Sequence, residues 1–200
     1  MQNRSWNLFI VAMCAVIVCV VGFQLFKLYS RKKPALPVFG GVPEFSLTAQ
    51  DKRTVTTNDL KGSVVIADFI FTECVGPCPM MTAQMSQFQT SLANDPTIKL
   101  LSFSVDPETD TPDVLTAYGK KFGANANKWT FLTGSKTDIY NLTRLGFHLT
   151  VEADSNAVTH STKFVLIDKK ALIRGYYDSS DDTTGERLLE DARTLAKEGK

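Results

Sequence analysis

The stretch VVIADFIFTECVGPCPMM, residues 64–81, contains the signals that determine the fold class of this chain. Residues 64–71 are almost all apolar and rich in β-branched side chains, a pattern typical of a strand buried on both faces. Cys74 and Cys78 follow at once, and Pro79 suits the first turn of a helix, where its missing N–H would have no partner. The stretch therefore predicts a buried strand, a turn with two cysteines and a helix.

Apolar runs and amphipathic patterns alternate from there to the C-terminus. The helix after Pro79 has an apolar stripe of Met81, Met85, Phe88 and Leu92. Further strands are predicted at 98–105, 129–134, 162–168 and 171–178, and further helices at 111–122, 135–146 and 183–199. Because strands that alternate with helices form βαβ units, we expect an α/β domain with a mostly parallel central sheet, helices on both faces and a final antiparallel hairpin.

The first thirty residues differ in composition from the rest. Residues 8–26, LFIVAMCAVIVCVVGFQLF, have one strongly polar member, Gln24. As a helix they would span about 28 Å, close to the roughly 30 Å hydrocarbon core of a bilayer. A cleaved signal peptide is the alternative, but its apolar region is only about 7 to 15 residues long. The sequence thus predicts a membrane anchor at 1–29, a linker at 30–42 and a folded domain at 43–200.

The charges beside this anchor leave its orientation open, and the net charge of the chain argues against nucleic acid as a partner. Four basic residues follow the predicted span and only Arg4 precedes it, so the positive-inside rule alone would keep the domain in the cytoplasm. Long domains, however, translocate largely regardless of flanking charge. A formal net charge of +1, from 22 Lys and Arg against 21 Asp and Glu, provides no electrostatic basis for binding nucleic acid.

Cys74 and Cys78 are the only cysteines outside the predicted span, in which Cys14 and Cys19 are given no functional role. A thiol at a helix N-terminus is expected to have a lowered pKa, because unpaired N–H groups and the helix dipole stabilise the thiolate. Residues four apart can place both sulfurs on one side, close enough to share a metal ion or form a disulfide. The pair therefore indicates redox exchange or soft-metal binding, ahead of a purely structural role.

The choice of metal depends on a third ligand. A structural zinc ion needs four ligands, whereas Cu(I) accepts two or three soft ones. The chain has two histidines. His148 lies in the apolar context LGFHLTV, which is typical of an ordinary core or surface histidine. His160 directly precedes the predicted strand at 162–168, in a loop that we expect to pack against the cysteine turn, and it is therefore the favoured third ligand.

Three segments together carry a resemblance to a known family. They are FxFTxCxxxCPxMT at 69–82, SFSVDPETDTPDVLTAYGKKFG at 102–123 and THSTKFVLID at 159–168. These segments resemble the Sco/SenC family of membrane-anchored copper chaperones for cytochrome c oxidase assembly, whose fold is thioredoxin-like. The turn CVGPC also resembles the thioredoxin motif C-G-P-C with one added residue, while Ser161 stands where thioredoxins carry a cis-proline.

The resemblance extends from about Phe39 to the C-terminus and carries expectations about function. It implies that Cys74, Cys78 and His160 bind Cu(I) or Cu(II). It also implies delivery of copper to, or reduction of the cysteines in, the binuclear copper site of cytochrome c oxidase. The expected partner is the oxidase subunit with that site, or another copper donor or acceptor. The expected location is the inner (cytoplasmic) membrane, with the domain on the extracytoplasmic side. Thr159 departs from the family, which often has Asp there.

A thiol-disulfide oxidoreductase is the alternative function. In that case one cysteine of the Cys74–Cys78 pair attacks a disulfide of the partner and the other resolves the mixed disulfide. The third ligand discriminates between the two functions, since electron exchange does not need His160. A peroxidase is disfavoured because the P-x-x-x-T-x-x-C pattern is absent, with alanine at position 67 and no arginine nearby.

The methionine and aspartate residues near the cysteine pair are assigned lesser roles or none. Thioethers suit Cu(I), but Met81 and Met85 belong to the apolar stripe of their helix, so core packing is favoured, and Met80 is given no role. Asp106 and Asp110 follow a predicted strand on the same edge as the cysteines. They are expected to shape the site or meet a partner, although Asp110 could equally cap the next helix.

Overall fold

The computed structural model describes residues 3–29, 35–147, 152–154, 157–159, 161–181 and 183–198. The chain forms two compact units, Met1–Ala35 and Leu36–Lys200. The first unit contains helix α1, Asn3–Tyr29, so the helix expected at 8–26 is present. Its predicted role as a transmembrane span has no support, because no helix within the described residues is both long and apolar enough to cross a membrane.

The second unit is built on an eight-stranded sheet with the order β1-β10-β9-β4-β5-β6-β2-β3. Its strands are β1 (Gly40–Gly41), β2 (Ser46–Ala49), β3 (Thr54–Thr56), β4 (Val64–Ile70), β5 (Ile98–Ser104), β6 (Trp129–Thr133), β9 (Lys163–Ile167) and β10 (Leu172–Asp178). A separate antiparallel pair consists of β7 (Glu152–Asp154) and β8 (Ala157–Thr159). The helices are η1 (Thr57–Leu60), α2 (Cys78–Ser91), α3 (Pro112–Lys121), α4 (Lys136–Asn141), η2 (Leu142–Gly146) and α5 (Thr184–Lys197).

The expectation of a mostly parallel sheet is wrong. Only β4–β5 and β5–β6 pair in parallel, and every other pairing in this sheet is antiparallel. The βαβ inference assumes that one crossover helix returns the chain to the start of the sheet. Between β6 and β9, however, the chain contains α4, η2 and the pair β7–β8, and β9 enters from the edge at which β4 ends. The expected final hairpin, β9–β10, is confirmed.

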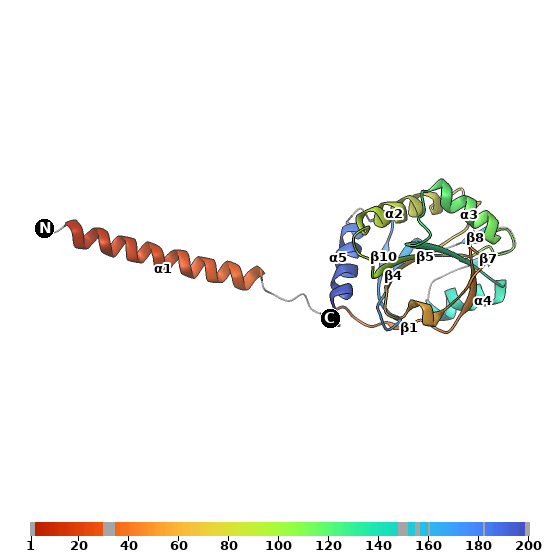
Figure 1. Ribbon diagram of the computed structural model, residues 1–200, viewed down its shortest axis with the longest axis horizontal. Helices are drawn as coiled ribbons and strands as arrows, with labels where there is room; N and C mark the ends of the chain where they lie inside the picture. The colour runs from red at the N-terminus through yellow and green to blue at the C-terminus, as the bar shows by residue number, and fades with distance from the viewer. Residues whose placement is uncertain are drawn as a thin grey trace. The chain divides into compact units, whose positions relative to one another are not determined.

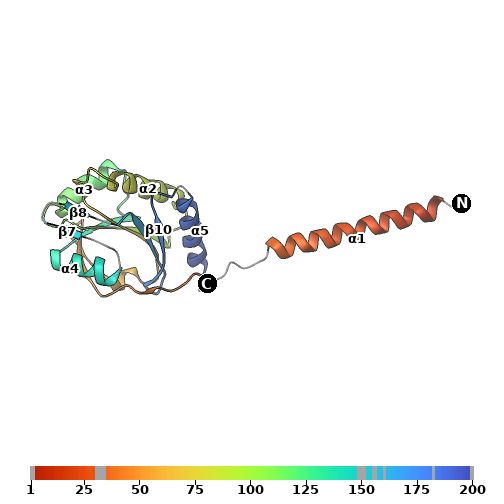
Figure 2. The same cartoon turned by 180° about the vertical axis from the view of Figure 1, so that it is seen from behind.

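The two faces of β4 are covered by different helices. Because successive side chains of a strand point to opposite faces, Val65, Ala67 and Phe69 pack into one core and Val64, Ile66 and Ile70 into the other. The first core is closed by η1, α4 and η2, and the second by α2, α3 and α5. Figure 1 shows α2 and α5 beside each other over one face and α4 over the other, and Figure 2 shows the same layers from behind.

Local predictions about the helices are confirmed. The α2 stripe of Met81, Met85, Phe88 and Leu92 is buried throughout. The side chain of Thr111 caps α3 by accepting a hydrogen bond from the backbone N–H of Val114. The side chain of Ser135 caps α4 in the same way, with the N–H of Asp138 as donor. Each signal depends on residues a few positions apart, so the sequence alone contains it.

The folded unit begins earlier than the boundary expected at Pro43. β1 pairs with β10, and the backbone N–H of Phe39 donates to the carbonyl of Ile173 at 2.9 Å. The buried guanidinium of Arg174 donates to the carbonyls of Leu36 and Pro37 at 2.7 and 2.9 Å. The C-terminal part of the predicted linker is therefore an ordered edge of the domain.

Candidate metal centre

The two predicted cysteines lie where β4 ends and α2 begins. Ile70 ends the strand, Cys78 is the first residue of the helix, and the connecting loop runs over the end of the sheet. The backbone N–H of Gly76 donates to Cys74 Sγ at 3.3 Å, which holds that sulfur against the loop. Cys74 is half-buried, Cys78 is fully buried, and Val75 between them is fully exposed. One sulfur of the pair therefore lies close to the surface and the other faces the core.

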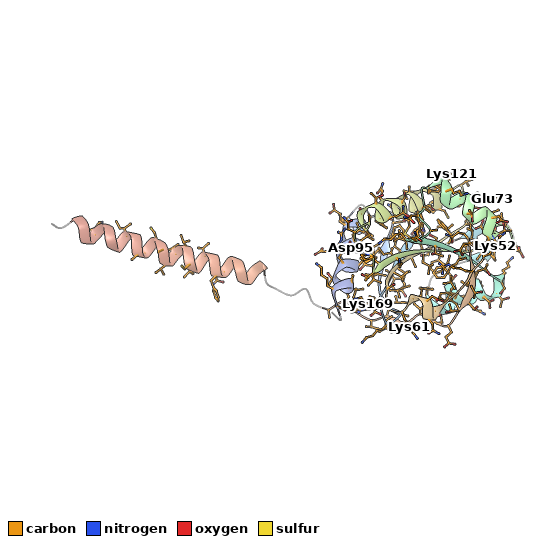
Figure 3. The ribbon with its side chains drawn as sticks, in the orientation of Figure 1. Lys52, Lys61, Glu73, Asp95, Lys121 and Lys169 are labelled. Carbon is orange, nitrogen blue, oxygen red and sulfur yellow. The ribbon has the colours of Figure 1, made fainter. Side chains whose placement is uncertain are left out.

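The position of this loop relative to the domain is visible from two labelled residues. Glu73, which precedes Cys74, and Asp95, which lies beyond the C-terminal end of α2, are at opposite ends of the domain (Figure 3). Ligands in open α/β sheets bind outside the carboxyl ends of the parallel strands, and the cysteine loop occupies that end of β4. The location agrees with the prediction made from the sequence.

Asp110 fixes the start of the cysteine loop. Its buried carboxylate accepts a 2.5 Å hydrogen bond from the hydroxyl of Thr72, a 3.2 Å bond from the Thr72 backbone N–H and a 2.6 Å bond from Ser104. Burial raises the pKa of this carboxyl group despite these donors. Since Thr111 caps α3, Asp110 has the first of its two predicted roles and shapes the site.

The expectation of a lowered thiol pKa is wrong for Cys78. Burial raises the pKa of this thiol far above its ordinary value, and the nearby Cys74 and Asp68 raise it further, while a backbone hydrogen bond at Phe71 acts in the opposite direction. A helix terminus contributes about 0.3–1 kcal/mol to a charged group, whereas full burial can shift a pKa by several units. Cys78 is therefore a protonated thiol when no metal is bound.

Asp68 is a second buried acid on this side of the sheet, and sequence reasoning missed it. It lies on β4 on the same face as Ile66 and Ile70, and neither carboxylate oxygen makes a hydrogen bond of normal geometry to any described residue. Burial raises its pKa to about 7, although the nearby hydroxyl of Ser102 acts in the opposite direction. The available signal was one charged residue within an otherwise apolar strand.

A short chain of hydroxyl groups lies beneath the cysteines. Thr82 Oγ1 donates to the backbone carbonyl of Cys78 at 2.8 Å and lies 2.9 Å from the hydroxyl of Tyr118 on α3. Burial, together with the nearby thiols of Cys78 and Cys74 and the carboxyl group of Asp68, raises the pKa of Tyr118 to about 12. These groups fix the first turn of α2 against α3, and thereby the backbone that carries Cys78.

The predicted third ligand, His160, lies outside the described residues, as does His148. The backbone on either side of His160 is nevertheless informative. β9 begins at Lys163 and runs antiparallel to β4, so its start and the end of β4 are at the same edge of the sheet. Within the described part of the chain, no group of three or more His, Cys, Asp or Glu side chains is placed to hold a metal ion. The three-ligand site stays a prediction.

Comparison with known proteins identifies the family. A family model described as SCO1/SenC matches residues 38–197. The chain belongs to the SCO1/SenC family. It is 32% identical over 159 residues to the SCO1 protein homolog of Bacillus subtilis. The matched region covers 78% of this chain and 82% of the relative. The thioredoxin-like α/β expectation for the domain is thereby confirmed.

Two solved Sco structures resemble the second unit closely. BsSco, described as a Sco family member with a disulfide switch, is 30% identical with a TM-score of 0.75, covering 84% of this chain and 99% of its own. ScoI of Arabidopsis thaliana, solved with copper bound, is 25% identical with a TM-score of 0.64, covering 78% and 98%.

The three methionines of α2 lie where the sequence predicts, two in the core and one at the surface. Met81 and Met85 are fully buried in the core under α2, and Met80 is 50% exposed on the first turn of the helix. The donor set that the described residues offer at the edge of the sheet is therefore two thiol sulfurs. Soft sulfur donors fit Cu(I) and leave a structural zinc ion short of ligands.

Proposed function

We propose that this Sco protein carries copper as cargo, binding it through Cys74, Cys78 and His160. It delivers the ion to the binuclear copper site of cytochrome c oxidase, or prepares the cysteines of that site. The observation that carries the proposal is the placement of both cysteines in the segment that follows the carboxyl end of β4, at the edge where β9 begins. Copper as the ion is supported by the copper-bound Arabidopsis relative.

The different environments of the two cysteines suit a carrier. Cys74 lies near the surface beside the exposed Val75, so an acceptor can reach the ion from that side and displace one ligand at a time. Cys78 is buried and gives up its proton when the ion arrives, because only the thiolate is a metal ligand. The accessible sulfur would then permit transfer, and the buried sulfur would retain the ion until transfer is complete.

A copper titration of the full chain, reduced and metal-free, tests this proposal. We expect one equivalent of Cu(I) to be retained against a competing chelator. Cys74→Ala and Cys78→Ala should abolish this binding, and His160→Ala should weaken it. The control is Cys14→Ser/Cys19→Ser, which removes the other thiols and should bind as the parent does. Unchanged binding in His160→Ala, with disulfide exchange intact, would contradict the proposed site.

A thiol-disulfide oxidoreductase is the second candidate function. It is favoured by the direct interaction of the two thiols, which raises the pKa of Cys78, and by the disulfide switch described for BsSco. The Cys74 thiolate would attack a partner disulfide and release one partner thiolate. The Cys78 sulfur, after losing its proton, would then attack Cys74 Sγ and release the second, so that two electrons pass to the partner. Disulfide exchange retained in His160→Ala but lost in Cys78→Ala would favour this function.

We also propose that the domain works outside the cytoplasm, held at the inner (cytoplasmic) membrane by residues 1–29. The support is the apolar composition of residues 8–26 and the suitability of an oxidising compartment for cysteines that can form a disulfide. Cell fractionation combined with protease treatment of intact spheroplasts tests the location. We expect the protein in the membrane fraction and cleavage from outside, and recovery in the cytosolic fraction would contradict the proposal.

A further inference from the structure

Large hydrophobic side chains are exposed at a few places on the described part of the second unit. They are Val38, Phe39, Val75, Met80, Val114 and Tyr140. Val75, Met80 and Val114 lie in the cysteine loop and on the first turns of α2 and α3, and we call these three residues the apolar patch. The other three are divided between the residues before β1 and helix α4. Exposed apolar side chains thus gather around the candidate metal centre, and such groups mark protein interaction sites.

The first turns of α2 and α3 lie side by side, although the two helices are distant in sequence. Thr82 Oγ1 lies 2.9 Å from the Tyr118 hydroxyl, and Ser86 Oγ donates to the carbonyl of Phe122 at 2.9 Å. Both contacts join residues 36 positions apart, so the helices run parallel and in register. One turn earlier, the same offset places Val114 beside the first turn of α2. The apolar patch is therefore one region at one end of the domain.

Val75 is the most prominent residue of the apolar patch, since its side chain is fully exposed. The loop that carries it is held on both sides. Asp110 binds Thr72 before it, and the backbone N–H of Gly76 after it donates to Cys74 Sγ at 3.3 Å. A loop that is already fixed loses little conformational freedom when a partner binds, which favours affinity. Any protein that reaches the sulfur of the half-buried Cys74 also contacts Val75.

Acidic side chains border the apolar patch and select the charge of its partner. Glu73 follows β4 and Asp106 follows β5, and these parallel strands end at the same edge of the sheet. Within the described part of the chain, neither carboxylate makes a hydrogen bond or an ion pair. The neighbouring Glu108 and Asp113 already have lysine partners, at 3.4 and 3.0 Å. The uncompensated charge beside the patch is negative, so a complementary surface is basic around an apolar centre.

Both candidate functions bring another protein to this surface. Copper transfer exchanges the ligand at Cys74 for one of the acceptor, and disulfide exchange joins the Cys74 sulfur to a partner sulfur. In either case the partner comes within bonding distance of this sulfur. Buried apolar anchors in protein interfaces are surrounded by contacts that exclude water. An apolar contact beside Cys74 would therefore shield the exchange from solvent.

We propose that the apolar patch is the centre of a docking surface for the oxidase domain that contains the binuclear copper site. Val75 would enter an apolar pocket of that domain, and lysine or arginine side chains around the pocket would face Glu73 and Asp106. The identity of this partner rests on the proposed function. Its chemistry, an apolar centre with a basic rim, follows from the exposure and charge of the surface.

An NMR titration tests the docking surface without any copper. The ¹⁵N-labelled full chain, reduced and metal-free, is titrated with the reduced, metal-free copper-site domain of the oxidase from the same organism. We expect saturable shifts of the amide resonances of residues 73–76, 80 and 114, and unchanged resonances around residue 38. The absence of saturable shifts, or shifts confined to residues outside the cysteine end, would overturn the proposal.

One isosteric substitution tests the role of Val75. Val75→Thr keeps the β-branched shape and replaces a methyl group by a hydroxyl, which an apolar pocket accepts poorly, so the dissociation constant should rise about tenfold. Val38→Thr is the matched control, because Val38 is 57% exposed beside the start of β10, at the opposite edge of the sheet. This control should bind the domain as the parent does. Equal affinity of Val75→Thr and the parent would overturn the assignment.

The salt dependence of binding tests the basic rim. Affinity should fall as the ionic strength rises from about 0.05 M to about 0.5 M, because salt screens exposed charges. Glu73→Gln should weaken binding at low salt by roughly twofold to fivefold, the effect of one exposed ion pair, and less at high salt. Asp95→Asn, at the opposite end of the domain, is the control and should match the parent. Binding that strengthens with salt, or that is unaffected by Glu73→Gln, would overturn the basic rim.

Copper titration of the parent separates this inference from the proposed function. If the parent fails to retain copper but docks on the oxidase domain in a way that depends on Val75, the proposed copper site fails and the docking surface stands. If the parent retains copper but Val75→Thr docks equally well, only the docking inference fails.

Discussion

Asp110 and Thr72 are joined by hydrogen bonds to both the hydroxyl and the backbone N–H of Thr72, at 2.5 and 3.2 Å. Asp110 precedes α3 and Thr72 begins the cysteine loop, so this contact fixes the loop to the neighbouring strand connection. Because Ser104 donates to the same carboxylate, removal of the carboxylate leaves three donors without an acceptor. The geometry of the sulfur pair therefore depends on a residue distant in sequence.

The first prediction concerns this contact. Asp110→Ala should destabilise the domain by roughly 2–4 kcal/mol, since a buried hydrogen-bonded network is lost, and should weaken Cu(I) binding by loosening the loop. Urea unfolding and chelator competition measure the two effects. Asp113→Ala, an exposed acid paired with Lys52, is the control and should change stability by less than about 1 kcal/mol. Parent-like copper affinity in Asp110→Ala would contradict a positioning role.

The second prediction concerns Asp68 and pH. Its pKa is raised from 3.8 to about 7 in the folded domain, so the unfolded chain ionises first as the pH rises. Stability should therefore fall between pH 3.8 and 7, by at most roughly 4 kcal/mol, and stay low above pH 7. Asp68→Asn should remove this fall and be more stable than the parent at pH 8. Urea unfolding at pH 5 and pH 8 gives the comparison, and an equal loss in both proteins would exclude Asp68 as its source.

The third prediction concerns proton release on copper binding. The raised pKa of Cys78 means that its thiol is protonated at neutral pH without metal. The thiol must lose this proton to bind copper, so the Cu(I) affinity should rise about tenfold for each pH unit between 6 and 8 from this group. Calorimetry in buffers of different ionisation enthalpy counts the protons. A pH-independent affinity would show that Cys78 is not a thiolate ligand.

The fourth prediction concerns the buried ion pair at the start of the domain. The guanidinium of Arg174 lies 2.8 Å from the Asp168 carboxylate and also donates hydrogen bonds to the carbonyls of Leu36 and Pro37. Arg174→Met should destabilise the domain by roughly 3–5 kcal/mol, because it leaves the Asp168 charge buried without its partner. Limited proteolysis should then cleave near residues 36–39.

Two further variants control this fourth experiment. Arg53→Met, which breaks an exposed pair with Asp51, should have an effect below about 1 kcal/mol. Adding Asp168→Asn to Arg174→Met should recover part of the lost stability, because it removes the uncompensated charge. If the double variant were no more stable than Arg174→Met, the loss would come from the freed N-terminal segment and not from the charge.

Only part of the candidate site can be predicted from the sequence. The sequence predicts that Cys74 and Cys78 lie between a buried strand and a helix, since a continuous apolar run, two cysteines and a proline are all local features. The burial of Cys78 is not local, because it depends on β4, α2 and α3 packing together around it. That packing reverses the direction of its expected pKa shift. His160 as the third ligand stays a prediction.

Local sequence patterns are enough to predict α2, α3 and α5, the caps at Thr111 and Ser135, the buried stripe of α2 and the order of the central elements. These features depend on residues a few positions apart, which interact whatever the rest of the chain does. Tertiary packing accounts for the antiparallel entry of β9, the burial of Asp68 beside Ser102 and a cavity lined by Gln84 and Thr184. Each of these depends on segments distant in sequence meeting at one place, where burial changes the charge state and pairing of the groups involved.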